Sequence, residues 1–455
     1  MRIAFVYMNS EQNIGRGAGY VAAAIREDGH DLTFYDSFYG TLDKISTEIL
    51  SEQYDILMIS SMTILFDDAL KLISIIKNTK NIPVLAGGIH VTILKDKILR
   101  DYPEIDYCCV GEGESMVIDF LRNFKTGSFS KVPNLIYREG SEVISNPVQD
   151  PEDLSRLPAF PWDLFRKEQI VTGDGFLHVN CTRGCPFNCT YCCNPIYLKL
   201  YKGKYLRMRP VDDVIGELRY LKKKHNPGLF YFADEMMLFN TNYVKELFGR
   251  FKKEIRSNFG LMARVEYLKE DTIKYLSDCG CKYVAIGVEC GDEEFSKKVL
   301  NRNISNSDIE KCIELLRKHK IFVTTYNMIG YPVEYDDTLT LKTVAFNNKI
   351  KPDFTQISIF YPFPGTSLYD KCIKEDLIDN EKVKSLKRYY GSSVLKGRDH
   401  ISAIWDILVK YYGMSSKIGW HFLPKRRKLY AISVRSLKLL KYYLKKLGLI
   451  ILACL

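Results

Sequence analysis

The sequence contains the cysteine-rich stretch Cys181-Thr-Arg-Gly-Cys-Pro-Phe-Asn-Cys-Thr-Tyr-Cys-Cys-Asn-Pro195. Within it, Cys185, Cys189 and Cys192 are separated by three residues and then by two. An iron–sulfur cluster of the cubane type is normally held by four cysteine thiolates. Three thiolates on one short loop would hold three irons of such a cluster and leave the fourth iron open to a small molecule. The spacing therefore predicts a 4Fe-4S cluster bound by these three cysteines.

Other cysteine chemistries fit this stretch less well. Cys181 and Cys193 flank the loop, but a ligand set that began at Cys181 would omit the Tyr-Cys pair at its end. Structural zinc sites usually close at four ligands, and the sequence has no second Cys or His pair with zinc spacing. A disulfide framework is disfavoured because 13 cysteines are an odd number and nothing marks secretion. We therefore expect Cys181 and Cys193 to be neighbours of the cluster.

With Tyr191 directly before the third cysteine, the loop resembles the cluster loop of the radical S-adenosylmethionine (radical SAM) enzymes. The resemblance implies that the amine and carboxylate of S-adenosylmethionine chelate the fourth iron. It also implies that one electron, delivered by an external flavodoxin- or ferredoxin-like donor, cleaves S-adenosylmethionine to a 5′-deoxyadenosyl radical. That radical would remove hydrogen from a small-molecule substrate.

Length and composition fit a multidomain enzyme. The 455 residues suffice for two or three domains, and a hydrophobic content of 46% suffices for sizeable cores. The apolar run Met1–Met8 lacks a following small-residue cleavage site and is expected to be a strand, not a signal peptide. No run approaches the ~20 apolar residues that a membrane-spanning helix needs. These features predict a cytoplasmic protein.

Residues 1–128 are predicted to form a doubly wound, Rossmann-like parallel sheet, because apolar strand-like runs alternate there with helix-like runs. The expected strands are Ile3–Met8, Leu32–Tyr35, Ile56–Met62, Val84–Gly87 and Tyr107–Val110. Ligands of such sheets bind in loops at the carboxyl ends of the strands. The candidate ligand-binding residues in these loops are Asn9, Ser60, Ser61, Thr63, Gly87, Gly88, His90, Gly111, Glu112 and Gly113.

In this order, and ahead of the cysteine loop, these loops resemble the cobalamin-binding domain of the cobalamin-dependent radical SAM enzymes. The resemblance implies that residues 1–128 bind cobalamin. In many cobalamin proteins the His of a D-x-H-x-x-G motif ligates cobalt. This sequence lacks that motif, and in this it resembles many radical SAM members, which also lack it. His90 follows two glycines and is more typical of a loop hydrogen-bonding residue than of a metal ligand. We therefore expect no protein ligand to the cobalt.

Residues 129–172 are predicted to form a connector with a hairpin around Glu139-Gly-Ser141, followed by a proline-punctuated linker. In residues 173–370 strands and helices alternate again, and this region resembles the partial (β/α)6 barrel of the radical SAM family. The expected strands are Leu177–Asn180, Leu229–Ala233, Phe259–Val265, Tyr283–Val288, Phe322–Met328 and Phe354–Phe360.

Polar residues end several of these apolar strands, where the chemistry of such barrels lies. A charged residue at the end of a buried strand needs a partner or a ligand, and S-adenosylmethionine offers hydroxyls, an amine and a carboxylate. Asp234 and Glu235 are the best candidates for a substrate or nucleoside contact, and a mutual salt bridge between Arg264 and Glu289 is as good an interpretation as cofactor contact. The candidate cofactor-binding residues are Tyr191, Asp234, Glu235, Arg264, Glu289, Asn327, Gly330 and Pro332.

Residues 371–455 form a basic, aromatic region that is expected to be helical. Residues 407–455 contain 11 Lys and Arg and no Asp or Glu, and because the net charge of the chain is +10, the rest is near neutral. In Leu437–Leu447, lysines alternate with apolar residues spaced three and four apart, as in an amphipathic helix. A helix docked on the barrel is favoured over contact with an anionic membrane surface, and a nucleic-acid partner is least favoured.

Together these features predict a cobalamin-dependent radical SAM enzyme, most simply a methyltransferase that acts on an unactivated carbon. A lipid-like substrate is a hypothesis that depends on membrane contact, with the enzyme peripheral at the membrane. Cyclases and rearrangement enzymes share the architecture and remain alternatives. A methylthiotransferase is disfavoured because those enzymes carry a second cluster on amino-terminal cysteines, whereas the first cysteine here is Cys108. A cobalamin- or redox-sensing protein without turnover is the alternative outside enzymes.

Overall fold

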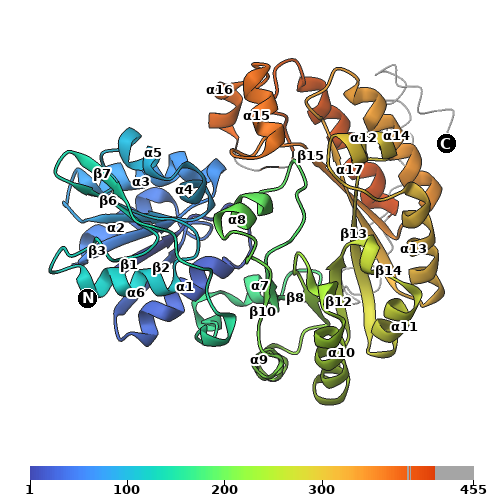
Figure 1. Cartoon of the computed structure of the whole chain (residues 1–455), viewed down its shortest axis with the longest axis horizontal. Helices are drawn as coiled ribbons and strands as arrows, with labels where there is room; N and C mark the ends of the chain where they lie inside the picture. The colour runs from blue at the N-terminus through green and yellow to red at the C-terminus, as the bar shows by residue number, and fades with distance from the viewer. Residues whose placement is uncertain (387–388, 390, 416–455) are drawn as a thin grey trace. The chain divides into compact units, whose positions relative to one another are not determined.

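The computed structural model describes residues 1–386, 389 and 391–415 (Figure 1). Contacts divide them into two compact units. The N-terminal unit comprises Met1–Ile170, Cys193–Met208 and Phe363–Gly365, and the barrel unit comprises Val171–Cys192, Arg209–Pro362 and the described residues from Thr366 onward. The basic amphipathic helix predicted at the end of the chain lies outside the described residues.

The N-terminal unit is built on a seven-stranded sheet with the order β2-β1-β3-β4-β5-β6-β7. The first five strands in the chain are mutually parallel, and the last two are antiparallel additions. The strands are β1 (Arg2–Tyr7), β2 (Asp31–Asp36), β3 (Ile56–Ser60), β4 (Val84–Gly87), β5 (Tyr107–Cys109), β6 (Leu135–Glu139) and β7 (Glu142–Ser145). The hairpin expected in the connector is β6–β7, which extends this sheet.

Helices cover both faces of the parallel strands. They are α1 (Arg16–Glu27), α2 (Leu42–Ser51), α3 (Phe66–Lys77), α4 (Ile89–Leu94), α5 (Asp96–Asp101) and α6 (Glu114–Asn123). In Figure 1, α1 and α6 lie together on one side of the sheet and α2 and α3 on the other, and each pair is in contact. Because both faces are covered, every residue of β1 after Arg2 is buried, which explains the unbroken apolar run. The predicted doubly wound sheet is confirmed.

The topology of this sheet creates one switch point, between β1 and β3. Successive connections leave β1 in opposite directions there, and ligands of such sheets bind in the crevice outside the strand ends at this point. The backbone N–H of Met8, just beyond β1, donates to the carbonyl of Ser60 at the end of β3 over 2.9 Å. The loops that follow β1 and β3 therefore leave the sheet side by side.

The barrel unit contains six parallel strands in the order β15-β14-β13-β12-β11-β8. Figure 1 shows them curling into an open half barrel with helices on its outer side. The strands are β8 (Phe176–Val179), β11 (Leu229–Phe232), β12 (Phe259–Ala263), β13 (Cys281–Glu289), β14 (Phe322–Ile329) and β15 (Phe354–Ile359). All six correspond to predicted strands, and the partial (β/α)6 barrel is confirmed.

The principal helices of the barrel unit are α9 (Val211–His225), α10 (Thr241–Arg250), α11 (Glu270–Asp278), α12 (Glu293–Lys298), α13 (Asn306–Lys318), α14 (Asp336–Ile350), α15 (Ser367–Lys374), α16 (Asn380–Ser385) and α17 (Asp399–Ser415). The last of these packs on the edge strand β15, where the indole of Trp405 donates to the carbonyl of Ile357 over 2.8 Å. Across the described part of the chain, no helix combines the length and the apolar character that crossing a bilayer requires.

Candidate functional site

The three predicted cluster cysteines follow β8, on the first loop of the half barrel. Cys189 is buried, Cys185 and Cys192 are partly exposed, and the backbone N–H of Cys192 donates to the carbonyl of Cys189 over 3.2 Å. The pKa of the Cys185 thiol is raised to about 11, mainly by burial; the sulfurs of Cys192 and Cys189 contribute to the rise, and Arg264 opposes it. The sulfur of Cys185 is therefore close enough to the other two to interact with them, and iron would have to displace its proton on binding.

Within the residues that the structure describes, no group of three or more His, Cys, Asp and Glu side chains is arranged to hold a metal ion. A four-iron cluster makes a different demand, because each thiolate binds a separate iron. The cysteine loop fits that demand in its chemistry: three thiols on one short turn, with an arginine beside them.

A buried carboxylate anchors the start of the cysteine loop. Asp234, which follows β11, is fully buried, and its Oδ1 accepts hydrogen bonds from the backbone N–H groups of Cys181 (2.7 Å) and Thr182 (2.5 Å). The hydroxyl of Thr182 donates to the same oxygen over 2.8 Å. Burial raises the pKa of Asp234 to about 7 in spite of these bonds. The sequence suggested a substrate contact here, whereas this oxygen holds the loop itself, beside Cys181.

The neighbouring Glu235 differs from Asp234 because its residue is exposed. Its carboxylate accepts a hydrogen bond from the backbone N–H of Gly184 and lies near the positive charge of Arg183. Both of these residues belong to the cysteine loop. Glu235 is thus the accessible carboxylate at this edge of the half barrel.

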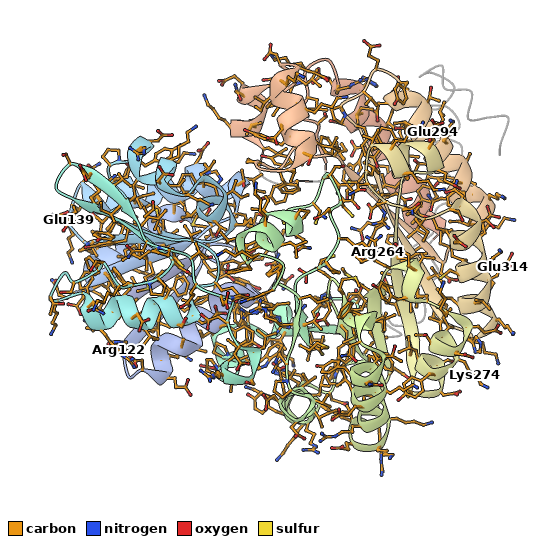
Figure 2. All side chains as sticks on the ribbon, viewed as in Figure 1. Arg122, Glu139, Arg264, Lys274, Glu294 and Glu314 are labelled. Carbon is orange, nitrogen blue, oxygen red and sulfur yellow. The ribbon has the colours of Figure 1, made fainter. Side chains whose placement is uncertain are left out.

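Arg264, which follows β12, lies against the same loop. Its guanidinium carbon is 3.6 Å from the centre of the Phe187 ring, and its Nη1 is 3.6 Å from the sulfur of Cys189. It also forms an ion pair with Glu266, whose Oε1 accepts from Nε over 3.2 Å. Figure 2 shows Arg264 on the inner side of the half barrel, whereas Glu294 and Glu314 project from outer helices.

A second arginine meets the loop at Tyr191. Arg302, after α12, donates from Nη1 to the Tyr191 hydroxyl over 3.3 Å and from Nη2 to the carbonyl of Gly287 over 2.6 Å. The same Nη1 is 3.6 Å from Oε1 of Glu289, which also interacts with the Tyr191 hydroxyl. Burial raises the pKa of Glu289, and the charge of Arg302 opposes that rise.

Glu289 reaches this position through an unusual backbone. The register between β13 and β14 shifts between Gly287 and Glu289, and Glu289 has a φ of 66°. A non-glycine residue in the left-handed region is strained, and such strain concentrates at functional sites. The mutual salt bridge that the sequence left open does not form, because Arg264 pairs with Glu266 and Glu289 pairs with Arg302. Sequence reasoning missed both partners.

The predicted residues at the end of β14 serve packing in the structure. The Asn327 amide donates to the carbonyls of Thr325 (3.2 Å) and Gln356 (3.1 Å), and its oxygen accepts from Asn347 over 2.8 Å. Gly330 has a φ of 78°, and a Cβ there would lie 3.0 Å from Ile401 in α17. Pro332 lies in a bend between β14 and α14.

In the N-terminal unit, Asn9 lies at the switch point in a polar network. Its side-chain N–H groups donate to Asp36 (3.2 Å) and to the carbonyl of Asn13 (3.3 Å), and its backbone N–H donates to the Ser37 hydroxyl over 2.7 Å. Gln169 donates to the same Asp36 carboxylate over 2.7 Å. Ser60 ends β3 and Thr63 begins a single 3-10 turn at Thr63–Leu65. The loops after β1 and β3 are thus ordered by the protein's own hydrogen bonds.

Gly88, directly after β4, is required by a close backbone approach. The N–H of Ser61 donates to the carbonyl of Gly87 over 3.1 Å, and a Cβ on Gly88 would lie 2.5 Å from the carbonyl oxygen of Ser61. His90, two residues on, is 9% exposed and its ring packs on Phe66 with centroids 4.2 Å apart. Burial lowers the pKa of His90 to about 4, so its imidazole is neutral at pH 7.

The loop after β5 packs on the segment 193–208, which includes α8 (Asn194–Leu200) and follows the cysteine loop directly. The backbone N–H of Glu112 donates to the Tyr201 hydroxyl over 2.6 Å, and a Cβ on Gly111 would lie 2.3 Å from that oxygen. A Cβ on Gly113 would lie 3.1 Å from the sulfur of Cys109. Glu112 also pairs with both terminal nitrogens of Arg207, at 2.6 and 2.9 Å. Sequence reasoning gave this segment no role.

Two known domain families match the chain in the order that the loops and cysteines predicted. The B12 binding domain matches residues 12–121, and the Radical SAM superfamily matches residues 179–341. An uncharacterized methyltransferase of Pyrococcus horikoshii is 27% identical over 369 residues, 80% of this chain and 79% of its own length.

The anaerobic magnesium-protoporphyrin IX monomethyl ester cyclase of Cereibacter sphaeroides is 24% identical over 418 residues, 86% of this chain but only 66% of its own length. Among solved structures, the cobalamin-dependent S-adenosylmethionine radical enzyme OxsB, with aqua-cobalamin and S-adenosylmethionine bound, matches with a TM-score of 0.71. That match covers 98% of this chain and 71% of the other at 16% identity, and it is a similarity of fold.

Proposed function

We propose that this chain, which belongs to the radical SAM superfamily and carries a B12 binding domain ahead of its radical SAM domain, is a cobalamin-dependent methyltransferase acting on an unactivated carbon. The observation that carries the proposal is the gathering of Arg264, Glu289 and Tyr191 around the cysteine loop. With their cofactors bound, the two domains would supply a hydrogen-abstracting radical and a methyl group.

Six residues of the barrel unit have a defined part in this proposal. Cys185, Cys189 and Cys192 would hold the cluster, and Asp234 fixes the turn on which the loop begins. The carboxylates of Glu235 and Glu289 would accept hydrogen bonds from the amine or the ribose hydroxyls of S-adenosylmethionine. The side chain of Glu289 is only 14% exposed, and the low local dielectric constant strengthens interactions of its carboxylate.

Cobalamin would be held at the edge of the sheet in the N-terminal unit. The switch point between β1 and β3, with its two adjacent loops, suits a large ligand. His90 packs on Phe66 away from that switch point in the strand order, at the start of α4. We infer that the cobalt receives no histidine from this loop.

Cyclisation or rearrangement is the second candidate, because one of the relatives described above, which matches 86% of this chain, is a cyclase. Anaerobic turnover with methyl-labelled S-adenosylmethionine separates the two. Transfer of the label to a product carbon, with one 5′-deoxyadenosine formed per turnover, supports the methyltransferase. Formation of 5′-deoxyadenosine without label in any product would favour the cyclase class, and absence of S-adenosylmethionine cleavage by the reduced protein would favour a sensor.

Membrane contact is a separate proposal that rests on residues 407–455. Each Lys or Arg near an anionic surface contributes ~1 kcal/mol of binding, so 11 of them support salt-sensitive binding. Flotation with anionic and neutral liposomes would compare the full chain with a chain that ends at Ser416. Equal flotation of the two chains would remove the membrane proposal and the lipid-like substrate with it.

A further inference from the structure

The guanidinium of Arg264 is held in one place by three contacts. Phe187 covers its face at 3.6 Å, Glu266 pairs with it, and its Nη1 points at the sulfur of Cys189 at 3.6 Å. The side chain is only 10% exposed, so water screens its charge weakly. Arginine stays charged at any physiological pH and offers its donors in a rigid plane.

The neighbouring arginine is used differently. Arg302 donates to the Tyr191 hydroxyl and to the carbonyl of Gly287, so its hydrogen bonds position the loop and not a ligand atom. Of the two, Arg264 is the residue that directs an N–H group at a cluster-ligand sulfur. Hydrogen bonds to the sulfurs and the net charge around a cluster set its reduction potential.

We propose that Arg264 is a positioning residue that raises the reduction potential of the cluster through Cys189. This inference rests on the proposed function, because it requires a cluster bound to the cysteine loop. Reduction takes one electron from a low-potential flavodoxin- or ferredoxin-like donor and lowers the cluster charge from 2+ to 1+. A fixed positive charge at the sulfur stabilises the reduced state, and Glu266 both orients that charge and partly offsets it.

The test is an anaerobic redox titration of the reconstituted full-length protein without S-adenosylmethionine, followed by the electron paramagnetic resonance signal of the reduced cluster. At the wild-type midpoint, Arg264→Gln should lower the ratio of reduced to oxidised cluster at least tenfold, which is ~59 mV for a one-electron couple. Arg264→Lys keeps the charge but not the planar donors, so its midpoint potential should lie between those of the wild type and Arg264→Gln. Glu266→Gln should move the midpoint in the opposite direction, upward.

Iron and sulfide content distinguishes this inference from the proposed function. A wild-type protein that cannot be loaded with four irons overturns both. Loaded variants whose midpoints all equal that of the wild type overturn the inference alone. An unchanged midpoint in Arg264→Gln with a loss of S-adenosylmethionine affinity also overturns it, because Arg264 would then be a cofactor ligand. If Arg264→Gln fails to hold a cluster, the inference is tested by the other two variants: the midpoint potential should be lower in Arg264→Lys and higher in Glu266→Gln than in the wild type.

Discussion

The carboxyl edges of the two parallel sheets carry similar sequence signals but use them differently. At the half barrel, charged residues that end buried strands converge on one loop: Arg264 reaches Cys189, and Glu289 faces Tyr191. At the N-terminal sheet, two of the loop glycines are required by the protein's own atoms, since a Cβ on Gly88 would meet Ser61 and a Cβ on Gly111 would meet Tyr201. A charged residue at the end of a buried strand is therefore the stronger indication of a site, because a partner or ligand has to compensate for its burial. A loop glycine is a weaker indication, because any atom that lies close to its backbone can require it.

The largest effect is expected when the cysteines of the half-barrel loop are replaced. Cys185→Ala, Cys189→Ala and Cys192→Ala should each reduce the bound iron from about four per chain to near zero, since each thiolate is expected to hold one iron. Iron analysis and the visible spectrum after anaerobic reconstitution provide the measurement.

Cys181→Ala and Cys193→Ala are the matched controls and should retain the cluster. Cys181 is fully buried and its backbone N–H is bound by Asp234, so the substitution removes a core sulfur but no proposed ligand. Retention of the cluster in Cys192→Ala together with its loss in Cys181→Ala would show that a different set of three cysteines binds iron.

The second test asks whether Gly111 is required by packing against Tyr201 or by a bound ligand. In Gly111→Ala the new Cβ would meet the Tyr201 hydroxyl at 2.3 Å in a residue with φ of 82°, so we expect about 2–4 kcal/mol of destabilisation. Tyr201→Phe in the same chain removes the clashing oxygen and should restore part of the loss. Denaturant unfolding followed by circular dichroism measures both.

Gly127→Ala controls for backbone strain alone. Gly127 has a φ of 68° but no atom within 4 Å of its would-be Cβ, so only about 1–2 kcal/mol should be lost. A Gly111→Ala protein that is no less stable than Gly127→Ala, yet fails to bind cobalamin, would assign the glycine to the ligand and erase the contrast between the two edges.

Patterns within a single strand or loop were enough to predict the two sheets and the cysteine loop. Apolar runs located all six strands of the half barrel, because helices cover the outer face of these strands and side chains from neighbouring strands pack together. Partners chosen only by folding could not be predicted: Arg302 is 111 residues from Tyr191, and nothing near either residue marks the pair. For the same reason the hairpin at β6 and β7 was predicted correctly, but its pairing with β5 was not.

The third test uses pH to measure how firmly His90 is buried. Burial lowers its pKa to about 4 from an ordinary 6.5, so the unfolded chain binds a proton more readily than the folded chain between these values. Stability is therefore complete above pH 6.5 and falls as the pH drops toward 4, by about 3 kcal/mol at most. Phe at position 90 cannot titrate, so the His90→Phe protein should lack this contribution to the loss of stability at low pH. Identical pH dependence of unfolding in the two proteins would mean that His90 is solvated.

The smallest effect is expected from His90 on the cofactor itself. Its ring packs on Phe66, and the buried Nδ1 has no hydrogen-bond partner among the described residues. An imidazole that ligated cobalt would need an open path to the metal, whereas this residue is only 9% exposed and its ring lies against Phe66. His90→Ala should therefore leave the cobalt spectrum of the loaded protein unchanged, with about one cobalamin bound per chain, as one switch point offers one site. A spectral change from a histidine-ligated to an unligated form would place His90 on the cobalt. The loops of the N-terminal sheet would then prove as chemically active as those of the half barrel.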